Sequence, residues 1–402
     1  MSTSRIPRWA SLILLGVGLL IVGIPGGWLY ISATAPKLHP SPLKIASVTK
    51  ASPSPKWAGA VEQSREMVRT SLSERNLPGL SVAVGINGDN VWAEGFGFAN
   101  IENSLPVTPD NRFRIGTAST LLTATGIGLL VEQGRLSLDD PIQVYAPEFP
   151  EKQWPVTIRQ VMGDVSGLKG EDVDDGVLTS GHCDRPGDAV RLFAKEPLEF
   201  QPGTKHNEST FGWVLLSAVA ETAAGKPLTE FLMDNVVGPL GMLDTLRESG
   251  KEPVPDEATS YIPRFLANPT YGPSPLARFD YSCYAGASGF LATPSDLVRF
   301  GMAINGGKVL RRETVQMLQT SQRLASGMET GFGLGWEVKT VTLAGKPVRA
   351  AGSTGSFWGG TTASLRTFPE RGMAVAVTSN ISFADAPLLA ERIAQAFAER
   401  QQ

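Results

Sequence analysis

The spacing of apolar residues changes along the chain and predicts different elements in its different parts. Residues 58–76 repeat apolar side chains at helical spacing, which is typical of an amphipathic helix. Two strand-like runs follow at 80–87 and 91–98, around the pair Asn87-Gly88. Because Asn-Gly between apolar runs favours a tight hairpin turn, we expect these runs to pair with each other.

Helices dominate the middle of the chain, and strands return near its end. Helical patterns occupy 117–133, 156–162, 209–224 and 294–304, strand patterns occupy 361–368 and 373–380, and a last amphipathic helix covers 385–399. This order predicts an α/β fold, more closely an α+β sandwich. An antiparallel sheet is built from N- and C-terminal strands and flanked by helices, with an inserted, mostly helical lobe. A cleft between the sheet and the lobe is the expected ligand site.

Residues 9–31 form an apolar run without any charge, after a short N-terminal tail at 1–8. A transmembrane helix needs roughly 20 apolar residues, so this run is long enough to span a bilayer. Trp9 at one end and Trp28 with Tyr30 at the other stand where an aromatic belt belongs. The run therefore predicts a single-pass membrane helix.

A Pro- and Ser-rich stretch at 32–57 separates this run from the globular part. Pro36 follows the small residues that a signal peptidase would need, so we expect an uncleaved signal anchor. The prolines favour an extended tether, and the globular domain then covers 58–402. Lysines after the run compete with the arginines before it, so charge alone leaves the orientation open. We expect the domain to be periplasmic or otherwise extracytoplasmic.

Composition excludes several classes of function. Of the 402 residues 42% are hydrophobic, which argues against disorder, and a net charge of −3 gives no electrostatic reason to bind nucleic acid. Only three His and two Cys are present, so we expect no metal site and no cofactor. Cys183 and Cys283 could pair in an oxidising compartment, but the sequence leaves this open.

Seven segments between residues 60 and 395 resemble one enzyme family. They are FRIGTASTLLTATGIGLLVEQGRLSLDDPI (113–142), VTIRQVMGDVSGL (156–168), FQPGTKHNESTFGWVLLSAV (200–219), VVGPLGM (236–242), AGASGFLATPSDLVRFG (285–301), FGLGW (332–336) and GGTTASLRTFPERGMAVAVTSN (359–380). In this order they resemble the serine β-lactamase and penicillin-binding-protein-like hydrolases, in particular class C-like esterases and the mitochondrial β-lactamase-like branch. The resemblance implies the β-lactamase/transpeptidase-like fold.

The family's first catalytic motif, Ser-x-x-Lys at the start of the central helix, is substituted here. The amine three residues after the serine takes up the proton of the nucleophile. This chain has Thr117 and Thr120 at those two positions. Thr117 keeps a hydroxyl and suits a helix N-cap, whereas the Thr120 hydroxyl accepts no proton at neutral pH.

The other two motifs are substituted as well. Glu208, followed by Ser209 and Thr210, stands where the family has the tyrosine of its second motif. The third motif, Lys/His-Thr/Ser-Gly, aligns with 352–354, and the basic residue is replaced by glycine. Asp164 stands where the family often has histidine. Losing the basic partners of the hydroxyl removes general acid–base help, which is worth ~10²–10⁴-fold in rate.

Binding groups could survive these substitutions. The resemblance implies an oxyanion hole formed by the backbone N–H groups of Thr117 and Gly355, which side-chain changes do not delete. Ser353 and Thr210 belong to the substituted motifs, and Phe357 and Trp358 would line the cleft. The expected ligand is a peptide, an ester or a small molecule derived from the cell wall.

Three functional hypotheses stay open at this point, and the least favoured is an inert structural domain whose anchor and tether matter most. In the first, the chain is a membrane-anchored relative of the hydrolases whose catalysis is impaired, a pseudoenzyme that acts as a binding or scaffolding module. In the second, it is an active esterase, peptidase or β-lactamase with a rebuilt site, in which Glu208 serves as the base for Thr117.

Overall fold

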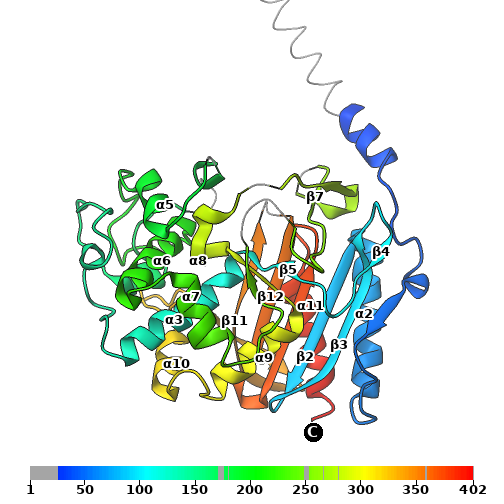
Figure 1. Cartoon of the computed structure of the whole chain (residues 1–402). Helices are drawn as coiled ribbons and strands as arrows, with labels where there is room; N and C mark the ends of the chain where they lie inside the picture. Colours follow the sequence, from blue (N-terminus) through cyan, green and yellow to red (C-terminus); the bar gives the residue numbers. More distant parts are fainter. Residues whose placement is uncertain are drawn as a thin grey trace, which may run out of the picture.

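Strands from the two ends of the chain form the central sheet of the protein. The structure is a computed structural model, and it describes residues 26–170, 176–179, 181–248, 253–265, 267–278, 280–357 and 360–401. Figure 1 shows this sheet with helices on both faces. The strand order is β1 (Ser47–Thr49), β3 (Asp89–Asn100), β2 (Gly79–Ile86), β13 (Met373–Ser379), β12 (Thr361–Phe368), β11 (Lys346–Phe357) and β10 (Glu337–Leu343), and β4 (Leu105–Pro106) pairs with β3. Neighbouring strands are antiparallel, which confirms the predicted architecture.

Each face of the sheet packs into its own core because successive side chains of a strand point to opposite faces. In β2, Val82 and Val84 join the core formed with α2 (Ala58–Arg75) and α11 (Ala386–Ala398). Ala83 joins the other core, which contains α9 (Pro294–Asn305) and the helical lobe. Both faces of this central strand are thus covered, and the whole strand is buried.

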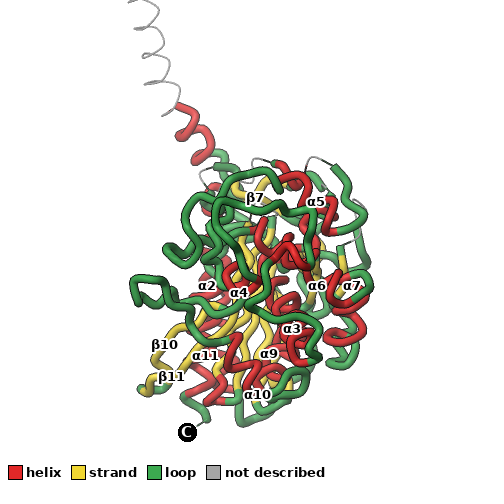
Figure 2. Tube along the Cα trace, turned by 90° about the vertical axis from the view of Figure 1, so that its left-hand side faces the viewer, coloured by secondary structure: helices red, strands yellow, loops and turns green. Residues whose placement is uncertain are grey.

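The inserted lobe is mostly helical, as predicted. Its helices are α3 (Thr120–Glu132), α4 (Ile158–Met162), α5 (Pro186–Phe193), α6 (Thr210–Ala224), α7 (Leu228–Leu232), α8 (Ala285–Ser288) and α10 (Arg312–Leu318), and the 3₁₀ turn η2 (Gly116–Ser119) precedes α3. Two small sheets complete the fold: β5 (Phe113–Arg114), β9 (Phe290–Ala292) and β6 (Leu246–Arg247) form one, and β7 (Tyr261–Pro263) and β8 (Pro273–Pro275) form the other. Figure 2 shows β10 and β11 on one side of the molecule and α6 and α7 on the other.

The hairpin turn between β2 and β3 has the predicted chemistry. Asn87 has φ = 54° and Gly88 has φ = 98°. Positive φ at both central residues is the requirement of the type I′ turn, which Asn-Gly meets with little strain. By contrast, the hydropathy pattern does not predict β10, because charged and polar residues interrupt its apolar ones.

Residues 36–57, which belong to the stretch expected to form an extended tether, dock onto the globular domain. The Asn76 side chain accepts a hydrogen bond from the N–H of Leu38 (2.9 Å) and donates one to the carbonyl of Pro36 (2.6 Å). The His39 ring stacks on Phe98 with a centroid distance of 5.6 Å. Further along, β1 pairs with β3 as an edge strand. Proline does exclude a long helix here, but the docked segment still finds partners for its backbone groups on the domain.

The predicted membrane helix lies mostly outside the described residues. Of the run 9–31, only residues 26–31 are described, and they belong to a helix over 26–33 that leaves the globular body at the end where β7 lies (Figures 1 and 2). Within the described ranges, no helix combines the length and the hydropathy that crossing a bilayer requires.

Candidate active site

Residues that are far apart in the sequence meet in a pocket of about 160 Å³ between the sheet and the lobe. It is lined by Thr117, Thr120, Asp164, Glu208, Ser209, Trp213, Phe332, Gly335, Glu337, Ser353 and Thr354. The structure therefore brings together four predicted site residues: Thr117, Thr120, Glu208 and Ser353. The pocket also lies where the cleft was expected.

Thr117 lies in η2, where it does not act as the N-cap of the central helix. Its Oγ1 donates a hydrogen bond to the backbone carbonyl of Thr354 on β11, at 3.2 Å. The N-cap position of α3 belongs to Ser119, which makes no side-chain capping bond. The hydroxyl of Thr117 is thus engaged with a carbonyl oxygen, which cannot take up its proton.

Gly355 brings β11 into contact with this turn. A Cβ at Gly355 would lie 2.1 Å from the carbonyl oxygen of Ile115 and 2.8 Å from the backbone nitrogen of Thr117. Only glycine permits so close an approach of two backbones. Gly116 has φ = 53°, which also favours glycine. Both glycines hold the Thr117 backbone against the strand.

Thr120 occupies the position that holds the motif lysine in the resembling enzymes. It is the first residue of α3 and is buried, with 5% of its surface exposed. Among the described residues that line this pocket there is no lysine, arginine, histidine or tyrosine. A side chain able to take the proton from Thr117 must therefore come from the carboxylates.

Three carboxylates line the pocket. Asp164 has φ = 54°, its carbonyl accepts the N–H of Asn207 at 2.8 Å, and its Oδ1 accepts the N–H of Ser209 at 3.4 Å. Glu208 is solvent-exposed at the rim, just before α6. Glu337 begins β10 and forms an ion pair with Arg366. The lining is consequently acidic, whereas the family's third motif would have made it basic.

A buried positive charge lies behind the strand β11, which contributes Ser353 and Thr354 to the pocket. Arg366 on β12 has a side chain that is only 3% exposed and contacts Glu337 at 2.6 Å. Its Nη2 also donates to the Thr354 hydroxyl at 3.2 Å, and that hydroxyl lies 3.0 Å from Ser364 Oγ. Arg366 was not among the residues predicted for the site. The one signal for it was a lone charge within the apolar strand pattern 361–368.

Two aromatic residues that were not predicted line the pocket. Trp213 and Phe332 line it, and the ring of His206 stacks on Phe332 with a centroid distance of 4.4 Å. Burial lowers the pKa of His206, so this ring is neutral at pH 7. Phe357 ends β11, and Trp358 lies outside the described residues.

One further predicted residue, Thr210, is not among the described residues that line the pocket. Thr210 is buried as the first residue of α6, and its neighbour Ser209 lines the pocket instead. The Ser209 hydroxyl accepts the N–H of Gly212 at 3.1 Å and donates to the carbonyl of Lys169 at 2.6 Å. Ser209 thus caps α6 and joins it to the loop after Asp164.

Cys183 and Cys283 form a disulfide, with their Cα atoms 4.9 Å apart. The sequence left this pairing open. In the described ranges, no group of three or more His, Cys, Asp or Glu residues could hold a metal ion.

Comparison with known proteins gives a consistent picture. The family model described as beta-lactamase matches residues 63–398. The human serine beta-lactamase-like protein LACTB, mitochondrial, is 28% identical over 319 residues. That match covers 62% of this chain and 57% of the human protein, so this chain spans little more than half the length of that relative.

Solved structures share the fold. The octameric penicillin-binding protein homologue from Pyrococcus abyssi matches with a TM-score of 0.67 and 24% identity, over 83% of this chain and 76% of that one. The D-amino acid amidase from Ochrobactrum anthropi, solved with L-phenylalanine amide, matches with a TM-score of 0.69 and 23% identity, over 85% of this chain and 97% of that one. At these identities the likeness concerns the fold alone.

Proposed function

Because this chain belongs to the beta-lactamase family, we propose that it is a membrane-anchored, extracytoplasmic member of that family whose catalysis is impaired. In this proposal its cleft binds an acyl or peptide-like ligand without rapid turnover. The apolar run 9–31 would serve as the anchor.

One observation carries the proposal of impaired catalysis. The pocket that holds Thr117 has the buried hydroxyl of Thr120 where the family places an amine. A threonine nucleophile needs a base within hydrogen-bond reach, and its β-methyl group also restricts approach to the hydroxyl. The Thr117 hydroxyl donates instead to the Thr354 carbonyl, which is not a base. This hydrogen bond supports a hydroxyl that is not activated as a nucleophile.

The proposed ligand class follows from what remains of the site. The backbone of Thr117 and Gly355 is held at the junction of η2 and β11, where the family's oxyanion hole would receive a carbonyl oxygen. Trp213 and Phe332 add an apolar wall. The carboxylates of Asp164 and Glu208 disfavour an anionic ligand, so we expect a neutral or cationic peptide or ester.

The disulfide supports the proposed location. Structural disulfides persist in oxidising compartments such as the periplasm and the cell exterior, and they are rare in the cytosol. Cys183 and Cys283 pair across 100 residues. An extracytoplasmic domain behind an N-terminal anchor agrees with this pairing.

Covalent labelling tests the proposal. We expect no adduct on Thr117 after incubation of the full chain with a fluorophosphonate or a β-lactam, as measured by intact-mass spectrometry, and no release of p-nitrophenol from p-nitrophenyl acetate above a heat-treated sample.

A Thr117 adduct that disappears in Thr117→Ala would contradict the proposal. It would favour the second candidate function, a rebuilt hydrolase. One observation speaks for that candidate: Glu208, a carboxylate that could serve as base, lines the same pocket as Thr117. An adduct that also disappears in Glu208→Gln would assign the base to Glu208.

A further inference from the structure

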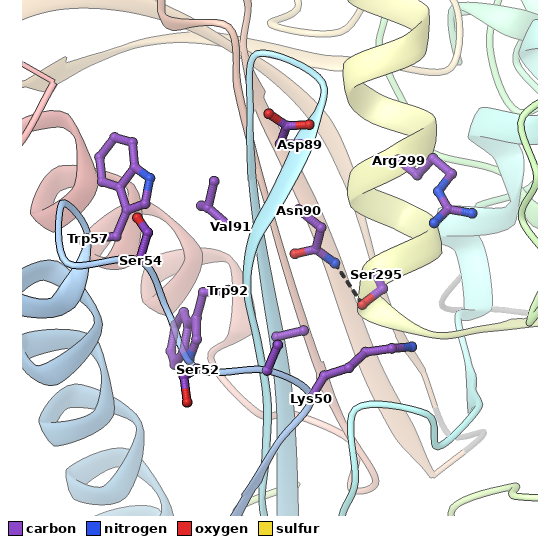
Figure 3. Close-up of a pocket in the computed structure, with 12 residues that line it drawn as sticks. Lys50, Ser52, Ser54, Trp57, Asp89, Asn90, Val91, Trp92, Ser295 and Arg299 are labelled. Carbon is purple, nitrogen blue, oxygen red and sulfur yellow. Dashed lines mark hydrogen bonds between the residues drawn. The ribbon is translucent and has the colours of Figure 1, made fainter.

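A second and larger hollow, of about 510 Å³, lies at the β3 edge of the central sheet, apart from the pocket around Thr117. Its lining comes from three places: the segment after β1, the first residues of β3, and the start of α9 (Figure 3). The lining residues are Lys50, Ala51, Ser52, Ser54, Trp57, Asp89, Asn90, Val91, Trp92, Ala93, Ser295 and Arg299.

The backbone of β3 is only partly covered at this edge. β1 pairs with Glu94–Phe96, and the N–H of Lys50 donates to the carbonyl of Ala93 at 3.1 Å. After Lys50 the segment that follows β1 no longer pairs with β3, although β3 begins five residues before Glu94, at Asp89. Within the described residues, Asp89–Trp92 therefore have β2 on one side and no strand on the other. Exposed strand edges of this kind accept an added strand.

The two sides of this edge differ in chemistry. On the α2 side, Trp57 is almost fully buried and forms an apolar wall with Val91 and Trp92. Val91 and Trp92 are consecutive, yet both pack into the core of that face, because β3 bulges opposite Val84 and Gly85. The bulge thus places the partly buried Val91 beside Trp92, which is almost fully buried.

The α9 side is polar and cationic. The Asn90 amide lies 3.0 Å from the Ser295 hydroxyl, and Arg299 follows one turn later on the helix (Figure 3). Arg299 is half exposed, its Nη1 donates to the backbone carbonyl of Gly241, and its nearest carboxylate, Asp296, is 4.0 Å away. Asp296 already accepts the N–H of Asp244 and the hydroxyl of Thr245.

Lys50 adds a second cation at the end of the hollow where β1 stops. It pairs with Asp110 at 2.6 Å, but both side chains are more than half exposed, and such pairs contribute little and exchange readily. Lys56 stands over the Trp57 ring at 4.7 Å and borders an adjoining hollow that shares Trp57, Asp89 and Val91. Asp89 is the one acidic residue that lines the hollow.

We propose that this edge binds an extended segment of a partner protein, added as a strand beside Asp89–Trp92, with acidic and apolar side chains in alternation. Successive side chains of a strand point to opposite faces. Apolar residues of the segment would then meet Trp57 and Val91, and acidic ones would meet Arg299 and Lys50. The site is separate from the cleft, so its failure would leave the proposed function untouched.

Peptide binding tests the proposal. The probe is a fluorescein-labelled peptide, Thr-Val-Glu-Val-Glu-Val-Thr, titrated with the full chain and followed by fluorescence anisotropy. We expect Arg299→Glu and Lys50→Glu each to weaken binding at least tenfold, because each places a like charge beside a glutamate of the peptide. Lys195→Glu, at an exposed position in the lobe, is the matched control and should bind as the unmodified chain does.

Two altered peptides separate strand pairing from simple charge attraction. Lysine in place of glutamate should abolish binding. Methylation of the central backbone amides removes N–H donors but no charge, and it should weaken binding at least tenfold because an added strand depends on main-chain hydrogen bonds. Equal binding of the methylated peptide would overturn the proposal. Unchanged peptide binding by both Arg299→Glu and Lys50→Glu would overturn it as well.

Folding and self-association are checked in the same variants. Thermal unfolding should stay within a few degrees of the unmodified chain, and Arg299→Gln replaces the glutamate variant if it does not. Hydrogen exchange should show new protection of 89–92 when the peptide binds. If Arg299→Glu instead dissociates an oligomer in sedimentation experiments, the edge pairs with a second copy of this chain and the proposal of a separate partner is wrong.

Discussion

At the scale of single residues, the charge at the site decides its chemistry. Thr120 leaves no amine beside Thr117, and the buried Arg366 is held behind β11 by Glu337 and the Thr354 hydroxyl. A guanidinium stays protonated at any physiological pH, so it cannot serve as the missing base. The carboxylates in front of it make the pocket acidic.

Restoring the motif residues should restore slow acylation. We expect the combination Thr117→Ser, Thr120→Lys and Glu208→Tyr to form an adduct with a β-lactam, because an amine next to the serine takes its proton. Thr117→Ser alone should form none. Time-resolved intact-mass analysis measures both, and labelling of the single variant would show that the missing base is not decisive.

Gly355 should be intolerant of any side chain. Gly355→Ala places a Cβ 2.1 Å from the Ile115 carbonyl oxygen, so β11 must move away from η2. We expect a loss of about 1–3 kcal/mol in the free energy of unfolding, as in other overpacked sites. Gly181→Ala, where a Cβ meets nothing within 4 Å, is the control for urea denaturation. Equal stability of the two variants would contradict this account.

At the scale of elements, the disulfide joins two segments of the lobe that are far apart in the sequence. Cys183 lies just before α5, and Cys283 lies in a 3₁₀ turn over Ser282–Tyr284 just before α8. The Cys183 N–H also donates to Ser282 Oγ at 2.9 Å. The sequence could not establish the pairing, because 100 residues separate the cysteines and only the lobe brings them together.

Removing the disulfide should destabilise the domain. We expect Cys183→Ser with Cys283→Ser to lose roughly 2–5 kcal/mol of unfolding free energy, because the unfolded chain regains the freedom of a long loop. Urea denaturation measures the loss. Treatment of the unmodified chain with a reductant should reproduce it, whereas the double variant should not respond to the reductant.

At the scale of the whole molecule, the docked segment 36–57 makes stability depend on pH. Burial lowers the pKa of His39, which stacks on Phe98 and lies 3.1 Å from the Pro78 carbonyl oxygen. Burial likewise lowers the pKa of His206. The unfolded chain therefore binds more protons than the folded one as the pH falls below about 6.5, and stability falls with it until the folded pKa is passed.

His182, the third histidine, acts in the opposite direction. Its hydrogen bond to Asp280 raises the pKa of His182 in the folded protein. His182 therefore stabilises the folded state at low pH, and this stabilisation is lost as the pH rises through the folded pKa. We expect the urea concentration at the unfolding midpoint to decrease when the pH is lowered from 7.5 to 5.5. His39→Gln should reduce this fall, and His182→Gln should increase it. An unchanged pH profile in His39→Gln would show that His39 does not titrate on unfolding.

The sequence by itself determined the elements whose causes are local. The Asn87-Gly88 turn, the strands 361–368 and 373–380 and the helix that ends the chain follow from periodicity and turn chemistry, which act between near neighbours. The motif comparison likewise anticipated that Thr117, Thr120, Glu208 and Ser353 share one pocket.

Only the tertiary structure decided what stands around those residues. The stacking of His206 on Phe332, the burial of Arg366 behind Thr354 and the open edge of β3 all arise between segments distant in sequence. The prolines of 32–57 excluded a long helix over this stretch, but the docking of residues 36–57 depended on Asn76 and Phe98, which no local pattern links to it. Local rules set what each segment can form, and burial and charge pairing between segments set where it lies and what it meets.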